Sequence, residues 1–266
     1  MVKNEIKNYG FEEPCITADN HILGGLGTVK KLLNPDLDWT PFLPKGERQK
    51  RLIETYTCTE YGTEEAIETL EKRLFLKDEN HSERLVAIGS KNKPTGNDPH
   101  IVAEWIRKNG LVNEEVLPFD DTITSWSQYF SPNPLTQKLK DKAKEWLTEY
   151  TFNHEWVFKG GSLKEKQKKL LEALQYSPVC VSVHAWKKRG GVYVKDRGDR
   201  DTHWTLLVKG NEGKPWIIRD SYLDDGNFMK KLDWNYPFGF AKLYILNKKP
   251  QSKPSCFLWK LFYKWV

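Results

Sequence analysis

The sequence predicts an α+β protein in which a mostly helical part is followed by a mostly β part. From Cys58 to Leu74, apolar residues recur at three- and four-residue spacing with Glu and Lys between them, which is the helical period, and three more helical stretches follow before Pro178. After Pro178 the apolar runs become short and rich in β-branched residues, which favours strands. Because helices and strands come in two blocks and do not alternate, the order indicates α+β rather than a parallel βαβ sheet.

The individual elements follow from the same patterns. Four helices are expected, at residues 58–74, 99–109, 135–150 and 163–174. The second of them has a proline in its first turn and Asn-Gly at its end, which are start and stop signals. Strands are expected at 179–184, 191–194, 203–209, 216–219 and 240–246.

The composition is that of a soluble globular protein. The chain has 266 residues, 38% of them hydrophobic and 29% charged, which argues against a disordered, collagenous or disulfide-scaffold class. The net charge of +6 is mild, and the lysines of 164–169 alternate with Glu and Gln as on a solvated helix face. With no finger spacing and no RNP-like motif, no nucleic-acid partner is expected.

The cysteines and the apolar runs indicate the cellular compartment in which the protein is expected. No run approaches the roughly 18 apolar residues of a transmembrane helix, and no secretory signal peptide is evident. No cysteine pair or Cys/His cluster has metal spacing, so neither a metal nor another cofactor is predicted. The four cysteines are therefore expected to be free thiols, and a reducing, intracellular compartment is favoured. They are Cys15, Cys58, Cys180 and Cys256.

Cys58 is the first candidate for chemistry. It stands at the expected start of a helix, where the positive end of the helix dipole favours a thiolate and hence a nucleophile. Taken alone, a cysteine is more often a small buried apolar residue.

Two further residues give Cys58 its context. His203 begins a strand-like run after a polar loop, and Asp220 ends the next strand, 17 positions later. Neighbouring antiparallel strands would place the carboxylate of Asp220 beside the imidazole, where it fixes the tautomer and stabilises the charge. Taken alone, His203 is more often structural and Asp220 is only a turn signal.

The order of the three residues carries a resemblance. His203 lies 145 positions after Cys58, and papain-like enzymes place their His and Asn about 130–150 positions after the Cys. The sequence resembles the papain-like cysteine peptidases over most of residues 38–246. Other matching segments are Asp38-Trp39, Ser82-Glu-Arg-Leu-Val, Pro178-Val-Cys-Val-Ser-Val, Thr202-His-Trp-Thr and Trp216-Ile-Ile-Arg-Asp-Ser-Tyr.

The resemblance implies a papain-like two-lobed α+β fold, with a helical lobe, an antiparallel β lobe and the active-site cleft between them. It implies Cys58, His203 and Asp220 as the catalytic residues and Gln49 as the oxyanion residue. The substrate-binding positions it implies are Gly96, Asn97 and Tyr222.

Several positions depart from the family pattern. Thr55 stands where a disulfide cysteine is usual, and Asp220 replaces the usual Asn. Asn97 replaces the second glycine of the substrate-binding loop, and Tyr222 replaces a Trp. Gln49 lies nine positions before Cys58, further than is usual in the family. Because an amide can accept the same imidazole hydrogen bond, Asp220→Asn is expected to slow the chemical labelling of Cys58 only mildly.

The expected activity is hydrolysis of peptide bonds in a peptide or protein substrate. Two alternatives remain open: a non-catalytic papain-like scaffold or binding module, and an amidase with the same three residues that acts on isopeptide or cell-wall peptide bonds. The expected organisation is an N-terminal extension at 1–37, a peptidase domain at 38–249 and an aromatic tail at 250–266 that docks on a protein partner or folds back.

Overall fold

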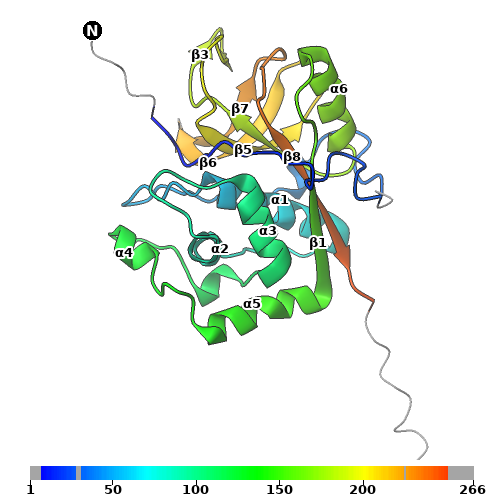
Figure 1. Cartoon of the computed structure of the whole chain (residues 1–266). Coiled ribbons are helices and arrows are strands. Elements are labelled where there is room, and N and C mark those ends of the chain that lie inside the picture. The colour runs from blue at the N-terminus through cyan, green and yellow to red at the C-terminus, as the bar shows by residue number, and fades with distance from the viewer. Residues whose placement is uncertain (1–6, 28–30, 225, 251–266) are drawn as a thin grey trace, which may run out of the picture.

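The computed structural model describes residues 7–27, 31–224 and 226–250. The helices of the first half lie together on one side of the molecule, and most of the strands lie on the other with α6 beside them (Figure 1). The described α-helices are α1 (Cys58–Phe75), α2 (Glu83–Ser90), α3 (Pro99–Asn109), α4 (Trp126–Tyr129), α5 (Gln137–Glu149) and α6 (Leu163–Leu174).

The strands form one eight-stranded sheet in the order β1-β8-β2-β5-β6-β7-β4-β3. The central neighbours β2, β5, β6 and β7 pair antiparallel. The strands are β1 (Tyr150–Trp156), β2 (Val179–Val183), β3 (Lys188–Arg189), β4 (Val192–Tyr193), β5 (His203–Lys209), β6 (Trp216–Asp224), β7 (Asn227–Leu232) and β8 (Ala241–Lys248). Two short 3-10 turns, Thr40–Phe42 and Glu114–Val116, complete the described elements.

The predicted α+β order is confirmed. The expected helices at 99–109 and 163–174 have these bounds in the structure, and the first expected helix runs one residue further, to Phe75. Five helices and strands were not predicted: α2, α4, β1, β3 and β7. The helix expected at 135–150 ends at Glu149, and Tyr150 begins β1 instead.

Helix α1 is the central element of the core. It packs against β5, β2, β6 and β8 of the sheet and against α2 and α3 on its other side. Its apolar positions Ala66, Ile67 and Leu70 are buried, as their helical spacing predicts. The helix therefore lies between the other helices and the sheet.

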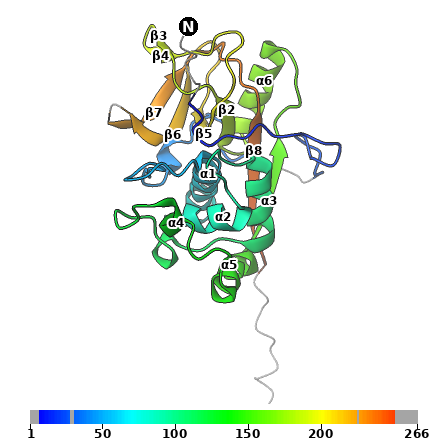
Figure 2. The same ribbon diagram turned by 60° about the vertical axis from the view of Figure 1, so that its left-hand side comes forward.

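The N-terminal segment, residues 7–27, runs along the junction between the helices and the strands (Figures 1 and 2). It is held by backbone pairing to both sides, through bridges between Phe11 and Asn97 and between Ile22 and Trp156. The predicted aromatic tail lies outside the described residues apart from Pro250, so its docking remains a prediction. No helix in the described part is both long enough and apolar enough to cross a bilayer.

Candidate active site

Cys58 is the first residue of α1, so the expected helix start is confirmed. Its side chain has no exposed surface, and its sulfur accepts a hydrogen bond from the backbone N–H of Trp204. Since Trp204 directly follows His203 in β5, the thiol lies against the strand that carries the candidate imidazole.

His203 and Asp220 meet in the sheet. The Nε2 atom of His203 lies 2.5 Å from Oδ1 of Asp220, and both side chains are fully buried. The register explains the contact: Leu206 of β5 pairs with Arg219 of β6, so Thr205 comes opposite Asp220. His203 lies two residues before Thr205 on the same face of the strand, which makes it a diagonal neighbour of Asp220. The other ring nitrogen of His203, Nδ1, is buried without a hydrogen-bond partner in the part of the chain that is described.

The pKa values of Asp220 and Cys58 are shifted in opposite directions. Burial alone would raise the pKa of Asp220, but the charges and hydrogen bonds of His203 and Lys230 hold it below its usual value. Burial raises the pKa of the Cys58 thiol well above its usual value, and the nearby carboxylates of Glu60 and Asp220 raise it further. Both effects favour the neutral thiol, which is the opposite direction to the one expected from the helix dipole alone.

Gln49 is fully buried beside the site. Its Nε2 lies 2.8 Å from the hydroxyl oxygen of Tyr222, 3.0 Å from the backbone oxygen of Tyr9 and 3.1 Å from Oε1 of Glu54. Its Oε1 accepts a hydrogen bond of 2.6 Å from the Ser221 hydroxyl. The amide is thus held in one orientation, and one of its donors points at a peptide carbonyl.

Three aromatic rings surround the imidazole of His203. Tyr9, Trp186 and Tyr222 contact it edge-on, with ring centroids 5.4 to 5.7 Å away. Tyr222, the position where the family pattern has a Trp, therefore shields the buried His–Asp pair from one side. A dry surrounding strengthens the charge interactions of that pair.

The N-terminal segment lies over this site as an extended peptide. The Tyr9 N–H donates to the backbone oxygen of Thr202, the residue before His203, at 2.9 Å. On the opposite side, the N–H of Asn97 donates to the Gly10 carbonyl at 3.0 Å, and the N–H of Glu12 donates to the Asn97 carbonyl at 2.9 Å. Asn97, expected to bind substrate backbone, here binds the backbone of its own chain.

Phe11 fixes the segment by side-chain burial. Only 4% of it is exposed, and its ring stacks on Trp204 at 5.7 Å. Gly10 allows the close approach: its φ is +113°, and a Cβ there would lie 2.4 Å from the carbonyl oxygen of Tyr56. Gly96 faces Gly10 in the same way, with a Cβ position 2.0 Å from the Gly10 oxygen.

Sequence reasoning missed two groups in the site. Tyr9 and Phe11 belong to a segment that was assigned to an extension, and no local pattern pairs it with the cleft. Lys230, whose Nζ lies 2.7 Å from Oδ2 of Asp220, belongs to β7, which was not predicted. Residues 227–232 read Asn-Phe-Met-Lys-Lys-Leu, which neither alternates between apolar and polar residues nor forms an apolar run, so the sequence does not predict β7.

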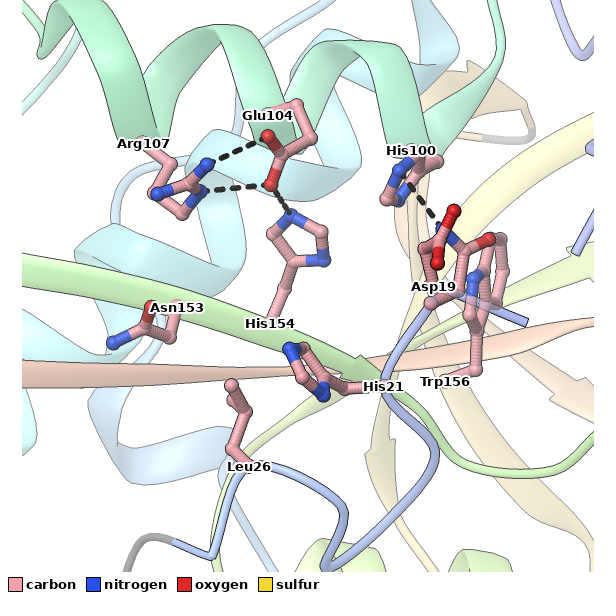
Figure 3. Close-up of a pocket in the computed structure, with 10 residues that line it drawn as sticks. Asp19, His21, Leu26, His100, Glu104, Arg107, Asn153, His154 and Trp156 are labelled. Atoms are coloured by element: carbon pink, nitrogen blue, oxygen red, sulfur yellow. Dashed lines mark hydrogen bonds and ion pairs between the residues drawn. The ribbon is translucent and has the colours of Figure 1, made fainter. Parts of the chain in front are cut away.

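A separate polar cavity of about 430 Å³ lies between α3, β1 and residues 19–26 of the N-terminal segment (Figure 3). Its imidazoles are His21, His100 and His154, and Glu104 accepts a contact of 3.1 Å from His154 (Figure 3). Behind it, the buried Nζ of Lys242 lies 3.2 Å from Nδ1 of His154. Within the described ranges, no three His, Cys, Asp or Glu side chains are placed so that they could hold a metal ion.

Comparison with solved structures identifies the architecture. Xylellain, a cysteine protease from Xylella fastidiosa, aligns with 93% of this chain and 98% of its own at 15% identity, with a TM-score of 0.62. Digestive procathepsin L 3 of the Tenebrio molitor larval midgut aligns with 81% of this chain and 71% of its own at 16% identity, with a TM-score of 0.59. The bromelain protease of Ananas comosus aligns with 79% of this chain and 98% of its own at 16% identity, with a TM-score of 0.54.

The chain has the papain-like fold, with a helical lobe and a β lobe, as the resemblance implied. No protein-family profile matches the sequence. No curated protein matches it either. The likeness is therefore one of architecture.

Proposed function

We propose that the protein is a thiol peptidase that hydrolyses peptide bonds with Cys58, His203 and Asp220. The proposal is carried by what surrounds His203. Asp220 lies on its Nε2, its Nδ1 has no hydrogen-bond partner among the described residues, and the Cys58 sulfur is bound to the backbone N–H of the next residue, Trp204. With the Nε2 proton donated to Asp220, Nδ1 carries the lone pair and can accept the thiol proton.

The reaction then follows as acyl transfer. Transfer of the Cys58 proton to Nδ1 of His203 leaves a thiolate, which attacks the scissile carbonyl and forms a tetrahedral adduct. The N–H groups of Gln49 and of the Cys58 backbone stabilise the oxyanion. The leaving amine takes the proton from His203, and the resulting thioester is hydrolysed by water that gives a proton to the same nitrogen.

In the resting state, the N-terminal segment occupies the place of the substrate. The Tyr9 carbonyl accepts a hydrogen bond from the Gln49 amide, and the backbone of the segment is hydrogen-bonded to the backbone of Asn97. The Tyr9 ring contacts the imidazole of His203. Cys58 is therefore shielded until residues 8–12 leave the cleft. The proposed peptidase is self-covered, and its activity requires displacement of this segment.

One observation favours a second candidate, the non-catalytic papain-like module. Cys58 has no exposed surface, and burial raises the pKa of its thiol, as expected for a cysteine that does not act as a nucleophile. The amidase alternative differs from the peptidase only in the bond cleaved, and both share the same site.

The test uses a variant with an opened cleft, Gly10→Ala, whose added methyl group would collide with Tyr56. We expect it to hydrolyse fluorogenic peptides, and the double variants Gly10→Ala/Cys58→Ala and Gly10→Ala/His203→Ala to be inactive. Hydrolysis of isopeptide or muropeptide substrates alone would select the amidase. If the Cys58 thiol of the Gly10→Ala protein can be alkylated but none of these substrates is hydrolysed, the result would favour the non-catalytic scaffold.

A further inference from the structure

Asp220 has a nitrogen partner on each of its carboxylate oxygens. Oδ1 lies 2.5 Å from His203 Nε2, and Oδ2 lies 2.7 Å from Nζ of Lys230. Lys230 of β7 pairs with Ile218 of β6, and the register of these two strands becomes irregular after Arg219. The lysine is therefore on the neighbouring strand, opposite a position only two residues before the carboxylate.

The ammonium group is fixed and dry. Only 4% of Lys230 is exposed, its Nζ also donates to the backbone oxygen of Tyr222 at 3.0 Å, and it lies 5.2 Å from the ring centre of Trp186. A buried lysine is retained as a cation when it is paired and hydrogen-bonded. Lys230 meets both conditions beside the candidate catalytic pair.

We propose that Lys230 is a positioning residue: by pairing with Oδ2 of Asp220, it offsets the carboxylate charge and sets how tightly His203 holds its proton. The proposal rests on the proposed function for its catalytic consequence. With Lys230 present, the Asp–Lys pair is neutral overall and can orient the imidazole as a neutral amide would. Without Lys230, the full carboxylate charge faces the imidazolium in a dry site, and the proton needed by the leaving amine is held more tightly.

This arrangement also changes what an amide at 220 does. Asp220→Asn removes the counter-charge of a buried ammonium, and breaking one partner of a buried pair is strongly destabilising. Besides the mild slowing of Cys58 labelling expected from the sequence, Asp220→Asn should therefore strongly lower the free energy of unfolding. Removing both charges together, in Asp220→Asn/Lys230→Met, leaves no buried charge unpaired.

The experiment compares four full-length proteins: the natural chain, Lys230→Met, Asp220→Asn and the double variant. The pH midpoint of the His203 ring-proton signal is followed by NMR, and each variant is also made with Gly10→Ala to measure kcat/KM against pH. We expect Lys230→Met to raise the His203 midpoint by about one pH unit. The alkaline limb of kcat/KM should move in the same direction, and the double variant should recover about tenfold or more of the kcat/KM lost in Asp220→Asn.

Two variants separate positioning from packing. Lys231→Met removes the same charge from the exposed neighbour on β7, and Lys230→Arg keeps the charge at the site; both should retain the natural midpoint. If Lys230→Met fails to fold, the double variant and Lys230→Arg still decide the outcome. An unchanged midpoint in Lys230→Met, or a double variant no better than Asp220→Asn, overturns the proposal.

The NMR midpoints do not depend on catalysis. If they move in the expected order while no Gly10→Ala protein cleaves peptides, the proposed function fails and the role of Lys230 in the proton affinity of His203 stands. If peptides are cleaved and the midpoints do not move, the proposed function stands and the role of Lys230 fails.

Discussion

The side-chain amide of Gln49 donates a 3.0 Å hydrogen bond to the backbone carbonyl of Tyr9. This is the interaction that an oxyanion-stabilising glutamine would make with the carbonyl of a substrate. Because the same amide also contacts Tyr222 and Glu54, its two hydrogens are already in use. Under the proposed function, a substrate carbonyl would therefore reach Gln49 only after Tyr9 has left.

Gly10→Ala should expose Cys58. The added Cβ would lie 2.4 Å from the Tyr56 oxygen, so the segment cannot seat in the cleft without backbone movement. We expect iodoacetamide to modify Cys58 at least tenfold faster than in the natural chain, equivalent to about 1.4 kcal/mol of lost closure. Peptide mapping by mass spectrometry gives the rate, and the exposed Cys15 of the same molecule is the internal reference.

Gly24→Ala is the matched control for this experiment. Gly24 also has a positive φ, +90°, but no atom lies within 4 Å of the Cβ that it would gain. It carries the same backbone strain without the collision. Equal acceleration of Cys58 labelling by both substitutions would show that strain in the segment, not occupancy of the cleft, controls access.

The pH dependence of Cys58 labelling should change when the cleft opens. In the natural chain, burial raises the pKa of Cys58, so labelling should keep rising into the alkaline range as the thiolate forms. In Gly10→Ala, hydration and a Cys58–His203 ion pair favour the thiolate, and labelling should level off at lower pH. Stopped-flow alkylation from pH 4 to about pH 10 measures both curves; superimposable curves would argue against a shielded thiol.

Gln49→Glu, tested in the Gly10→Ala protein, should lower kcat by about a hundredfold. The glutamate keeps an oxygen for the Ser221 hydroxyl but loses the N–H donor that would face the oxyanion. Steady-state hydrolysis of one peptide gives kcat and KM, and circular-dichroism melting checks that the variant is folded. A folded Gln49→Glu protein with unchanged kcat would remove Gln49 from the mechanism.

Lys242 should make stability rise with pH above neutrality. Burial lowers the pKa of Lys242 to about 7 from 10.5, while the charges of Asp98 and Glu104 act in the opposite direction. Between these two values the unfolded chain binds a proton that the folded chain does not, so the free energy of unfolding increases with pH. Lys242→Met should flatten this rise, as measured by urea unfolding at pH 7, 8 and 9 (roughly the window of the shift).

Lys169→Met is the control for the Lys242 experiment, because Lys169 is exposed on α6. It removes the same charge without changing a buried group, so its stability should follow the natural chain at each pH. Identical slopes for the Lys242→Met variant and the natural chain would show that Lys242 is not the group responsible.

Local pattern was enough for the long elements. Helices α3 and α6 have strong boundary signals, a first-turn proline in one and a Ser162–Glu165 capping box in the other, and their predicted bounds match the structure. The buried strands β2 and β5 are runs of apolar and β-branched residues, and they too were predicted. These signals depend only on neighbours in the sequence.

Strand β1 was missed because its stability comes from distant partners. Its buried positions include the polar residues His154 and Glu155, which no strand pattern anticipates. Glu155 accepts hydrogen bonds from the backbone N–H groups of Gly24 and Leu26, more than 120 positions earlier. Tertiary contacts of this kind override local propensity.

The candidate site also contains residues that local sequence predicts and residues that it does not. The contact between His203 and Asp220 followed from two adjacent strands, and the helix start at Cys58 followed from periodicity. The roles of Lys230 and Tyr9 could not be predicted, because each depends on a tertiary approach of a segment with no motif of its own. The catalytic assignment itself remains a prediction.

Because residues 8–12 are part of the same chain as the site they cover, a free copy of that segment is expected to bind the site only weakly. A covalently attached segment competes at an effective concentration that is typically in the millimolar range for short flexible links. A segment that closes the cleft most of the time as part of the chain therefore needs only a weak intrinsic affinity. A free peptide with the sequence of residues 7–27 would then be a poor inhibitor, and a peptide substrate present at micromolar levels would have to bind far more tightly than the segment does to displace it.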